Sequence, residues 1–260
     1  MLNSANPISL YQAEILRLPK NNCSTADYIQ RALKILQNYN FLQHLSASEH
    51  ALLLNHLKIK RYVHHQVIYH QNQPSNEVMI IIDGTLKLGW HVPNAQYHTD
   101  SFIPSGTMIN IVPVITQQPL MHEYIAQGST IVANLAGDMM REILQHNARA
   151  QYALFNIICV RTQLQRANAV FASTLSLRTR LVKEILFLIH YHFYRDDIKL
   201  NQANFAELLQ STRQKINKEF AYLVQQGLVE VKYNRIRILD YAGLKQLSEH
   251  ANPVATTEFI

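Results

Sequence analysis

The stretch 211–220, STRQKINKEF, places four side chains with base-recognition chemistry within six residues. Arg213 and Lys218 carry donors that match the O6 and N7 atoms of guanine. Gln214 and Asn217 carry amides that can bond N6 and N7 of adenine bidentately. These residue types at this spacing predict a helix that enters the major groove of DNA and reads bases there.

The flanking residues predict the elements that would position this helix. Helical patterns occur at 178–193, 201–209 and 212–226, and strand patterns follow at 228–233 and 235–240. Helix, helix, turn, helix and hairpin make a winged helix-turn-helix. The residues expected in its small core are Phe205, Ala206, Leu208, Leu209, Ile216, Phe220 and Leu223.

One turn residue departs from the usual pattern. Gln210 stands where a left-handed backbone usually calls for glycine. Either glutamine adopts that conformation at a small cost, or the turn differs locally.

Charge is concentrated in the same part of the chain. Residues 210–237 contain six basic and two acidic side chains, giving +4, out of a net charge of +6 for the whole sequence. Basic and hydroxyl side chains around the predicted reading face suit DNA phosphates. The residues expected to contact the DNA backbone are Ser211, Thr212, Lys215, Lys232, Arg235 and Arg237.

Composition excludes several other classes of protein. The chain has 260 residues, of which 48% are hydrophobic and 16% charged, so we expect a globular protein with a sizeable core. Its two cysteines, Cys23 and Cys159, are too few for a zinc quartet, an iron–sulfur cluster or a disulfide scaffold. We find neither a signal peptide nor an apolar run long enough for a membrane span, and we expect a cytoplasmic protein with no membrane partner.

The first half of the chain predicts two helices followed in sequence by a β-rich domain. Helices are expected after Ser24, which has Asp27 three residues on, and after Ser46 or Ser48. Short strand patterns then follow from 62 onward, with Asp83-Gly84 as a hairpin signal. Further strands are expected at 99–106, 109–115 and 122–136. Many short strands with turn residues between them predict a jelly-roll-like sandwich or barrel.

A long helix is expected between the two regions. Special or apolar residues recur there in a 4,3 alternation that is typical of a coiled-coil seam, with the lone asparagine suited to pairing with its symmetry mate. An ordinary amphipathic helix packed on its own domain is the alternative, because Arg161 is awkward in any seam. The residues predicted at the dimer interface are Ile157, Arg161, Leu164, Asn168 and Phe171.

The order of these regions resembles the Crp/Fnr family of bacterial transcription regulators. The resemblance rests on FLQHLSASEHALLLNHL, on VIYHQNQPSNEVMIIIDGTLKL before PSGT, on LSLRTRLVKEILFL, and most specifically on ANFAELLQSTRQKINKEFAYLVQQGLVEVKYNRIRILDYAGL. It implies an α+β fold, a homodimer, a near-palindromic DNA site and RNA polymerase as a candidate partner. The implied parts are an N-terminal extension and helix (1–40), a cyclic-nucleotide-binding-like β-roll domain (41–145), a dimerisation helix (146–175), a winged helix-turn-helix domain (176–250) and a tail (251–260).

The chain departs from the cyclic-nucleotide-binding members of that family at the ligand positions. Asn110 and Ile111 stand at their Gly-Glu pair, and Leu120 and Met121 at their Arg-Ser pair, so neither the carboxylate nor the guanidinium is present. Because a cyclic phosphate would be left unpaired, we expect no cAMP or cGMP binding. An iron–sulfur cluster is not expected either, since Cys23 stands alone.

An apolar effector is the remaining option for this domain. The residues that would line its pocket are Met108, Ile109, Ile111, Val112, Leu120 and Met121, and the alternative is that they are ordinary core. Thiol sensing by Cys23 or Cys159 is a weaker option, because a cysteine on an apolar helix face is usually inert.

Two rival functions differ in class from a DNA-binding regulator. A metal enzyme would use His64, His65 and His70, but adjacent histidines on a strand point to opposite faces, and no other catalytic motif is present, so we expect no metal and no enzyme. A ligand-sensing or protein-interaction module whose winged domain does not read DNA is the stronger rival.

Overall fold

A computed structural model describes residues 24–92, 97–191 and 197–249, and at 164, 167–174, 190–191 and 249 it describes the backbone alone. The chain divides into two compact units, Met1–Thr162 and Gln163–Ile260. Predictions about residues 1–23, Cys23 and the tail lie outside the described residues.

The first unit begins with helices that are capped as predicted. Helix α2 spans Thr25–Asn38, and the Ser24 side chain and Asp27 form a capping box at its start. The backbone N–H of Ser24 donates to Asp27, which lowers the pKa of that carboxyl group. A short 3-10 helix, η1 (Leu42–His44), leads to α3 (Ala47–His56), for which Ser46 is the N-cap.

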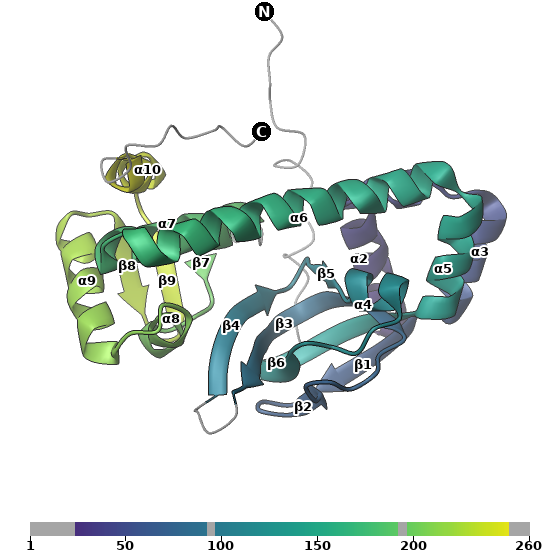
Figure 1. Ribbon diagram of the computed structural model, residues 1–260, viewed down its shortest axis with the longest axis horizontal. Helices are drawn as coiled ribbons and strands as arrows, with labels where there is room; N and C mark the ends of the chain where they lie inside the picture. Colours follow the sequence, from purple (N-terminus) through teal and green to yellow (C-terminus); the bar gives the residue numbers. More distant parts are fainter. Residues whose placement is uncertain (1–23, 93–96, 192–196, 250–260) are drawn as a thin grey trace, which may run out of the picture. The chain divides into compact units, whose positions relative to one another are not determined.

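These helices precede an antiparallel sheet (Figure 1). Its strand order is β1-β6-β3-β4, while β2 also pairs with β6 and β5 with β3. The strands are β1 (Lys58–Tyr62), β2 (Val67–Tyr69), β3 (Glu77–His91), β4 (Tyr97–Pro104), β5 (Met108–Ile109) and β6 (Glu123–Ala136). The predicted strands at 99–106 and 122–136 are therefore confirmed as β4 and β6.

The predicted hairpin at Asp83-Gly84 is wrong. Strand β3 runs straight through these residues, and its register against β6 shifts on both sides of Asp83. Gly84 has a φ of 87°, and an added Cβ would lie 2.5 Å from the carbonyl oxygen of Ser129. A positive φ at glycine suits a β-bulge as well as a hairpin turn, so the local sequence does not distinguish the two.

The predicted strand at 109–115 is also wrong. Its residues 111–115 form the helix α4 (Ile111–Thr116), and only its first residue belongs to a strand, β5. Asn110 has a φ of 66°, which breaks the extended backbone before the helix. Pro113 is tolerated because the first turn of a helix has no internal partner for its N–H groups.

Two hydrophobic clusters lie on opposite faces of the sheet, because successive strand residues point to opposite sides. Val78, Ile80 and Ile82 face a cluster with α2, α3 and the following helix α5 (Gly137–His146). Met79 and Ile81 face the interior of the roll. Figure 1 shows α3 and α5 side by side at one end of the sheet.

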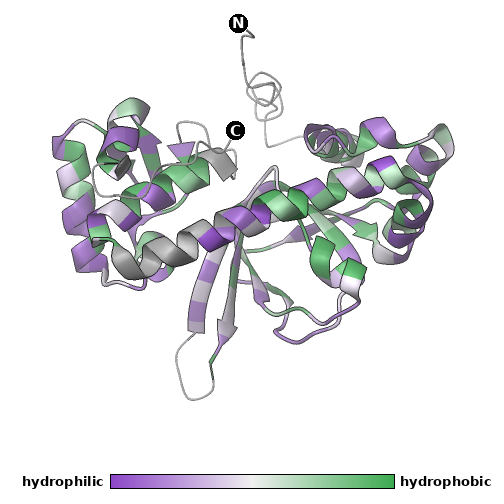
Figure 2. Ribbon diagram, turned by 45° about the horizontal axis from the view of Figure 1, so that its top comes forward, coloured by the Kyte–Doolittle hydropathy of each residue, from purple (hydrophilic) through white to green (hydrophobic). Residues whose placement is uncertain are grey.

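Helix α6 (Ala148–Thr174) continues from the first unit into the second. Hydrophilic and hydrophobic residues alternate along the described part of this helix (Figure 2). No helix in the described ranges is both long and apolar enough to cross a membrane.

The second unit has the predicted order of helices and wing. Its elements are α7 (Leu177–Tyr191), β7 (Asp197–Ile198), α8 (Gln202–Leu208), α9 (Arg213–Gln225), β8 (Val229–Lys232), β9 (Arg235–Ile238) and α10 (Tyr241–Glu249). Strand β9 lies between β7 and β8. The sequence indicated neither β7, which is two residues long, nor α10.

Candidate nucleic-acid interface

The turn between α8 and α9 is built around a left-handed glutamine. Gln210 has a φ of 48°, so it adopts the conformation that glycine usually provides. The Arg180 guanidinium donates to the carbonyl oxygen of Leu209 at 2.8 Å and so satisfies the end of α8. Thr212 then caps α9 by accepting from the N–H of Lys215 at 3.3 Å. The turn is thus fixed from both sides.

Helix α9 is anchored through one buried stripe. Ile216, Phe220 and Leu223 are fully buried, as expected from their spacing of four and three residues. The Phe220 ring meets the edge of Phe205 on α8, with ring centroids 5.2 Å apart and planes at 77°. The other predicted core residues are buried as well, apart from the half-buried Leu208.

The predicted reading residues lie in the N-terminal half of α9, outside this buried stripe. Arg213, Gln214, Lys215 and Lys218 are exposed. Asn217 is half-buried, and its Oδ1 atom is enclosed without a hydrogen-bond partner among the described residues. Because a bidentate bond to adenine needs that oxygen, Asn217 is oriented less favourably than the other three base-reading residues.

A pair that the sequence did not indicate connects α7 to the recognition helix. The Nε atom of Arg178 donates to Oε2 of Glu219 at 2.7 Å. The same guanidinium lies 3.6 Å from the centroid of the Tyr222 ring, which adds a cation–π contact. These residues are far apart in sequence, so no local pattern could have revealed them.

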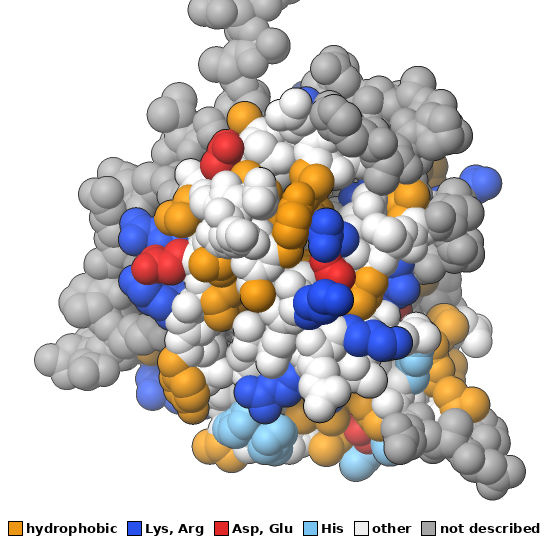
Figure 3. All heavy atoms as spheres, turned by 90° about the vertical axis from the view of Figure 1, so that its left-hand side faces the viewer, with side chains coloured by type: hydrophobic (Ala, Val, Ile, Leu, Met, Phe, Trp, Pro, Cys, Tyr) orange, Lys and Arg blue, Asp and Glu red, His pale blue; other side chains and the backbone are white. Residues whose placement is uncertain are grey.

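The wing is less basic than its sequence suggests. Lys232 pairs with Glu230 at 3.1 Å, and Arg235 pairs with Asp197 of β7. The contact with Asp197 raises the pKa of Arg235. Figure 3 looks toward α9 and the wing, where Lys and Arg side chains lie among polar, apolar and acidic ones and form no continuous patch.

The predicted dimer seam on α6 faces its own domain where its side chains are described. Ile157 packs against the helix-covered core of the first unit. The Arg161 guanidinium lies 5.8 Å from the Tyr39 ring centroid and 3.5 Å from its hydroxyl oxygen. The side chains of Leu164, Asn168 and Phe171 lie outside the described residues.

A different side of α6 is exposed and apolar. Tyr152 and Phe155 are 71% and 60% exposed. Cys159 is half-buried and Thr162 exposed, so these four residues follow one face at spacings of three, four and three.

The residues predicted to line an effector pocket are not brought together. Met108 and Ile111 belong to the helix-covered core, whereas Ile109 and Leu120 belong to the interior of the roll. Val112 and Met121 are exposed, Met121 by 77%. The prediction treated neighbouring residues as one surface, but β5, Asn110 and α4 send them to different faces of the domain.

Asn110, which stands at one of the ligand positions of the cyclic-nucleotide-binding members, is hydrogen-bonded to a buried tyrosine of the roll. The Tyr124 hydroxyl donates to Oδ1 of Asn110 at 2.6 Å, and Nδ2 of Asn110 donates to the Glu77 carbonyl oxygen at 3.3 Å. Leu120 is 1% exposed in the same cluster as Tyr124. Burial raises the pKa of Tyr124, so this hydroxyl remains a donor.

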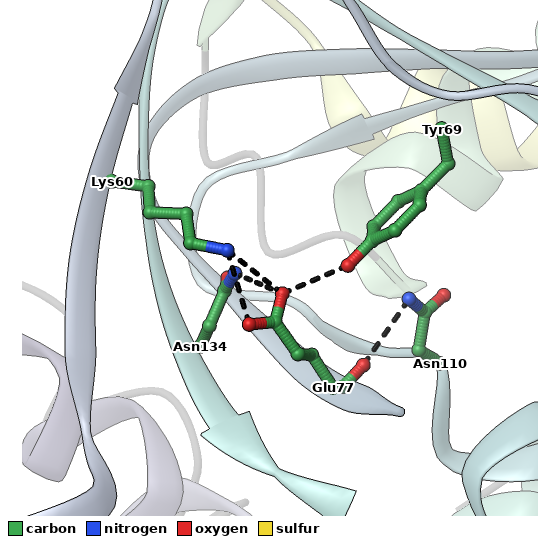
Figure 4. A network of polar contacts seen from close by, with 5 residues as sticks. All are labelled: Lys60, Tyr69, Glu77, Asn110 and Asn134. Atoms are coloured by element: carbon green, nitrogen blue, oxygen red, sulfur yellow. Dashed lines mark hydrogen bonds and ion pairs between the residues drawn. The ribbon is translucent and has the colours of Figure 1, made fainter. Parts of the chain in front are cut away.

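A charged network centred on Glu77 lies next to Asn110 (Figure 4). Its carboxylate accepts from Lys60 at 3.0 Å, from the Tyr69 hydroxyl at 2.8 Å and from Asn134 at 2.6 Å. Burial alone would raise the pKa of Glu77. The hydrogen bonds from Lys60, Tyr69 and Asn134 and the charge of Lys60 outweigh burial, so this pKa lies below its ordinary value. The lysine is therefore already paired inside the domain.

The histidines do not lie as the sequence predicted. His64 and His65 are in the turn between β1 and β2, not on a strand, and their rings stack with centroids 3.7 Å apart. His64 accepts from the N–H of Gly128 at 2.9 Å. Among the described residues, no group of three or more histidine, cysteine or acidic residues is arranged to hold a metal ion.

Comparisons with known proteins agree with this organisation. Residues 59–147 match the family model of the cyclic nucleotide-binding domain, and 179–247 match that of the Crp-like helix-turn-helix domain. No curated relative matches the chain. These two domains, in this order on one chain, define a transcription regulator. The chain belongs to the Crp/Fnr family, as the resemblance in its sequence implied.

Solved structures share the fold at low sequence identity. FixK2 from Bradyrhizobium japonicum is 12% identical with a TM-score of 0.67, over 76% of this chain and 99% of that one. The c-di-GMP-responsive global regulator CLP from Xanthomonas campestris is 14% identical, with a TM-score of 0.58 and coverage of 75% and 100%. A CRP-family transcriptional regulator from Thermus thermophilus is 19% identical, with a TM-score of 0.57 and the same coverage. The predicted α+β fold class is confirmed.

Proposed function

We propose that this chain is a cytoplasmic, homodimeric, sequence-specific DNA-binding regulator that needs no cyclic nucleotide. Each protomer would place α9 in the major groove of one half of a near-palindromic site. RNA polymerase is the partner that such a regulator would contact or exclude at a promoter.

The observation that carries this proposal is the construction of α9. A fully buried stripe fixes the helix, and the exposed side presents Arg213, Gln214 and Lys218 near its N-terminus. Arginine and lysine can read guanine there, and glutamine can read adenine. Ser211, Thr212 and Lys215 precede or flank these residues and suit phosphates. The Thr212 oxygen caps the helix, but its O–H is still able to donate.

The β-roll supports independence from cyclic nucleotides. A cyclic phosphate would meet buried Leu120 in place of a guanidinium. The carbonyl of Asn110 is already bonded to Tyr124, and the neighbouring cation, Lys60, is already paired with Glu77. Leaving a phosphate unpaired in this interior would cost several kcal/mol, about the whole affinity of a micromolar ligand.

The dimer face that we propose is the exposed face of α6, formed by Tyr152, Phe155, Cys159 and Thr162. Large aromatic residues are costly to leave in water and are common at the centre of interfaces. This face replaces Ile157 and Arg161 of the predicted seam, which already have contacts within their own domain.

Selection from random duplex oligonucleotides tests the proposed function. The purified full-length protein, without added ligand and at physiological salt, should enrich a two-fold symmetric sequence. The double variant Arg213→Ala/Lys218→Ala should lose that preference, since each lost base contact costs about 1–3 kcal/mol. Equal binding of the enriched and scrambled duplexes by both proteins would instead favour a protein-interaction module. A micromolar dissociation constant for cAMP, measured by calorimetry, would refute the proposal that this protein needs no cyclic nucleotide.

A further inference from the structure

Helix α8 ends in a Schellman motif that leads into the turn before α9. The N–H of Ser211 donates to the carbonyl oxygen of Ala206 at 2.9 Å, and the N–H of Gln210 donates to that of Glu207 at 3.2 Å. In this motif the residue after the helix end adopts a left-handed backbone and is usually glycine. Here it is Gln210, with a φ of 48°. A residue with a side chain adopts this conformation at a steric cost, so the surrounding structure must hold it there.

Arg180 of α7 holds the peptide group that sets this conformation. Its Nη2 atom donates to the carbonyl oxygen of Leu209 at 2.8 Å. That oxygen and the backbone nitrogen of Gln210 belong to the same planar peptide group. The φ of Gln210 is the rotation about the bond that follows this plane, so a fixed carbonyl group favours the left-handed backbone at Gln210. The hydrogen bond thus compensates for the absence of glycine.

The Arg180 side chain acts from a well-fixed part of α7. Its backbone N–H donates to the carbonyl oxygen of Ser176 at 2.9 Å, within the first turn of the helix. The hydroxyl oxygen of Ser176 accepts from the N–H of buried Thr179 at 3.2 Å. Helix α7 also packs against α9, so the guanidinium and the turn that it holds belong to one packed assembly of helices.

The geometry of this turn affects the residues that read bases. Arg213 is the first residue of α9 and lies three positions after Gln210. A bidentate contact with a base edge requires two atoms to be in the correct place at once, whereas attraction to phosphates depends mainly on charge. A changed φ at Gln210 would alter the direction in which the chain enters α9. Base discrimination should therefore suffer more than overall attraction to DNA.

We infer that Arg180 is a positioning residue for DNA recognition, which raises sequence specificity by holding the left-handed turn before α9. This inference rests on the proposed function. It assigns a role in specificity to a residue of α7, outside both the recognition helix and the wing.

Fluorescence anisotropy with the enriched duplex and with a scrambled duplex of the same length tests this role in the full-length protein. Arg180→Ala should bind the enriched duplex about 5- to 50-fold more weakly, which is about the effect of one lost base contact. Its affinity for the scrambled duplex should change by less than about threefold, because the phosphate contacts remain. Arg180→Lys keeps the charge and a donor and should keep most of the preference. Lys245→Ala is the control, since it removes one positive charge from an exposed site on α10.

Replacing the glutamine tests whether Arg180 acts through the turn. Arg180→Ala/Gln210→Gly should recover most of the preference for the enriched duplex, because glycine adopts a positive φ without a holding contact. Gln210→Gly alone should bind like the wild type. If the double variant is as unselective as Arg180→Ala, Arg180 does not act through Gln210 and the inference is overturned.

The ratio of the two affinities separates positioning from folding. A variant that is partly unfolded loses affinity for both duplexes equally, and such a result for Arg180→Ala would overturn the inference. If Arg180→Ala keeps the wild-type ratio while Arg213→Ala loses it, the inference is also overturned and the proposed function stands. If the wild type prefers no duplex, the proposed function fails and the inference fails with it.

Discussion

Arg178 at the start of α7 donates its Nε–H to the carboxylate of Glu219 on α9 at 2.7 Å, while its guanidinium covers the Tyr222 ring. Two elements that are distant in sequence are thereby joined at the recognition helix. The pair also neutralises the only acidic residue of that helix.

Replacing Arg178 by alanine should therefore weaken DNA binding by roughly 5- to 50-fold. The unpaired carboxylate of Glu219 would repel phosphates, and removal of one partner of a partly buried pair is costly. The double variant Arg178→Ala/Glu219→Gln should recover most of the affinity, because no charge is left unpaired. Fluorescence anisotropy with the enriched duplex measures both. If the double variant binds DNA as weakly as Arg178→Ala does, Arg178 does not act by neutralising Glu219, and its role is purely structural.

Charges on the exposed face of α6 should dissociate the dimer. Tyr152→Asp/Phe155→Asp would place two carboxylates where we propose that two copies meet, so we expect a monomer by analytical ultracentrifugation. Val160→Asp is the control, since Val160 is 45% exposed but lies roughly 80° and 140° round the helix from the other two positions. A dimer that survives the double substitution but not the control would place the interface on the other side.

Glu77→Gln should destabilise the first unit in a pH-dependent way. The folded-state pKa of Glu77 is depressed, so its ionised form contributes stability above the ordinary value of 4.5, and this contribution is lost as pH falls through the folded pKa. We expect a loss of about 1–3 kcal/mol at pH 7 that shrinks below pH 4.5. Urea unfolding followed through Trp90, the single tryptophan, measures it. Glu142→Gln, at an exposed carboxylate, serves as the control. If Glu77→Gln loses the same stability at pH 7 as below pH 4.5, the ionised form of Glu77 is not what stabilises the unit.

Gly84→Ala should destabilise the same unit by more than a surface substitution does. The new Cβ would meet the Ser129 carbonyl oxygen at 2.5 Å, and the φ of 87° is strained for any L side chain. We expect about 2–4 kcal/mol from the combined strain and clash. Gly106→Ala is a matched control, because its φ is also positive but nothing lies within 4 Å of an added Cβ. Equal losses at the two glycines would show that the close approach to β6 is unimportant.

The winged unit could be predicted almost completely from the sequence, whereas the β-roll could be predicted only in class. In α9 the buried positions Ile216 and Phe220 repeat at helical spacing, and Gly227 ends the element, so local rules determine the outcome. In β3, Gly84 satisfies the same backbone requirement in a bulge as in a hairpin, and only pairing with the distant β6 decides between them.

The dimer face that we propose on α6 illustrates the same limit at the level of a helix. Ile157 and Arg161 recur at seam spacing, but the Tyr39 ring and the helix-covered core already use that side. The sequence gives the period of a helix and does not give which of its sides meets its own domain. The pairing of Arg235 with Asp197 was missed for a similar reason, since Asp197 lies far from the wing in sequence.

Those wing ion pairs have a consequence for counterion release. Binding of a fully basic surface releases about one condensed cation for each phosphate that it neutralises, which makes affinity fall steeply as salt rises. To contact phosphates, Lys232 and Arg235 must first break their ion pairs with Glu230 and Asp197. The two freed carboxylates then bind cations from solution, which offsets part of the counterion release. The logarithmic dependence of DNA affinity on salt should therefore be shallower than the six basic residues of 210–237 would give if each neutralised a phosphate.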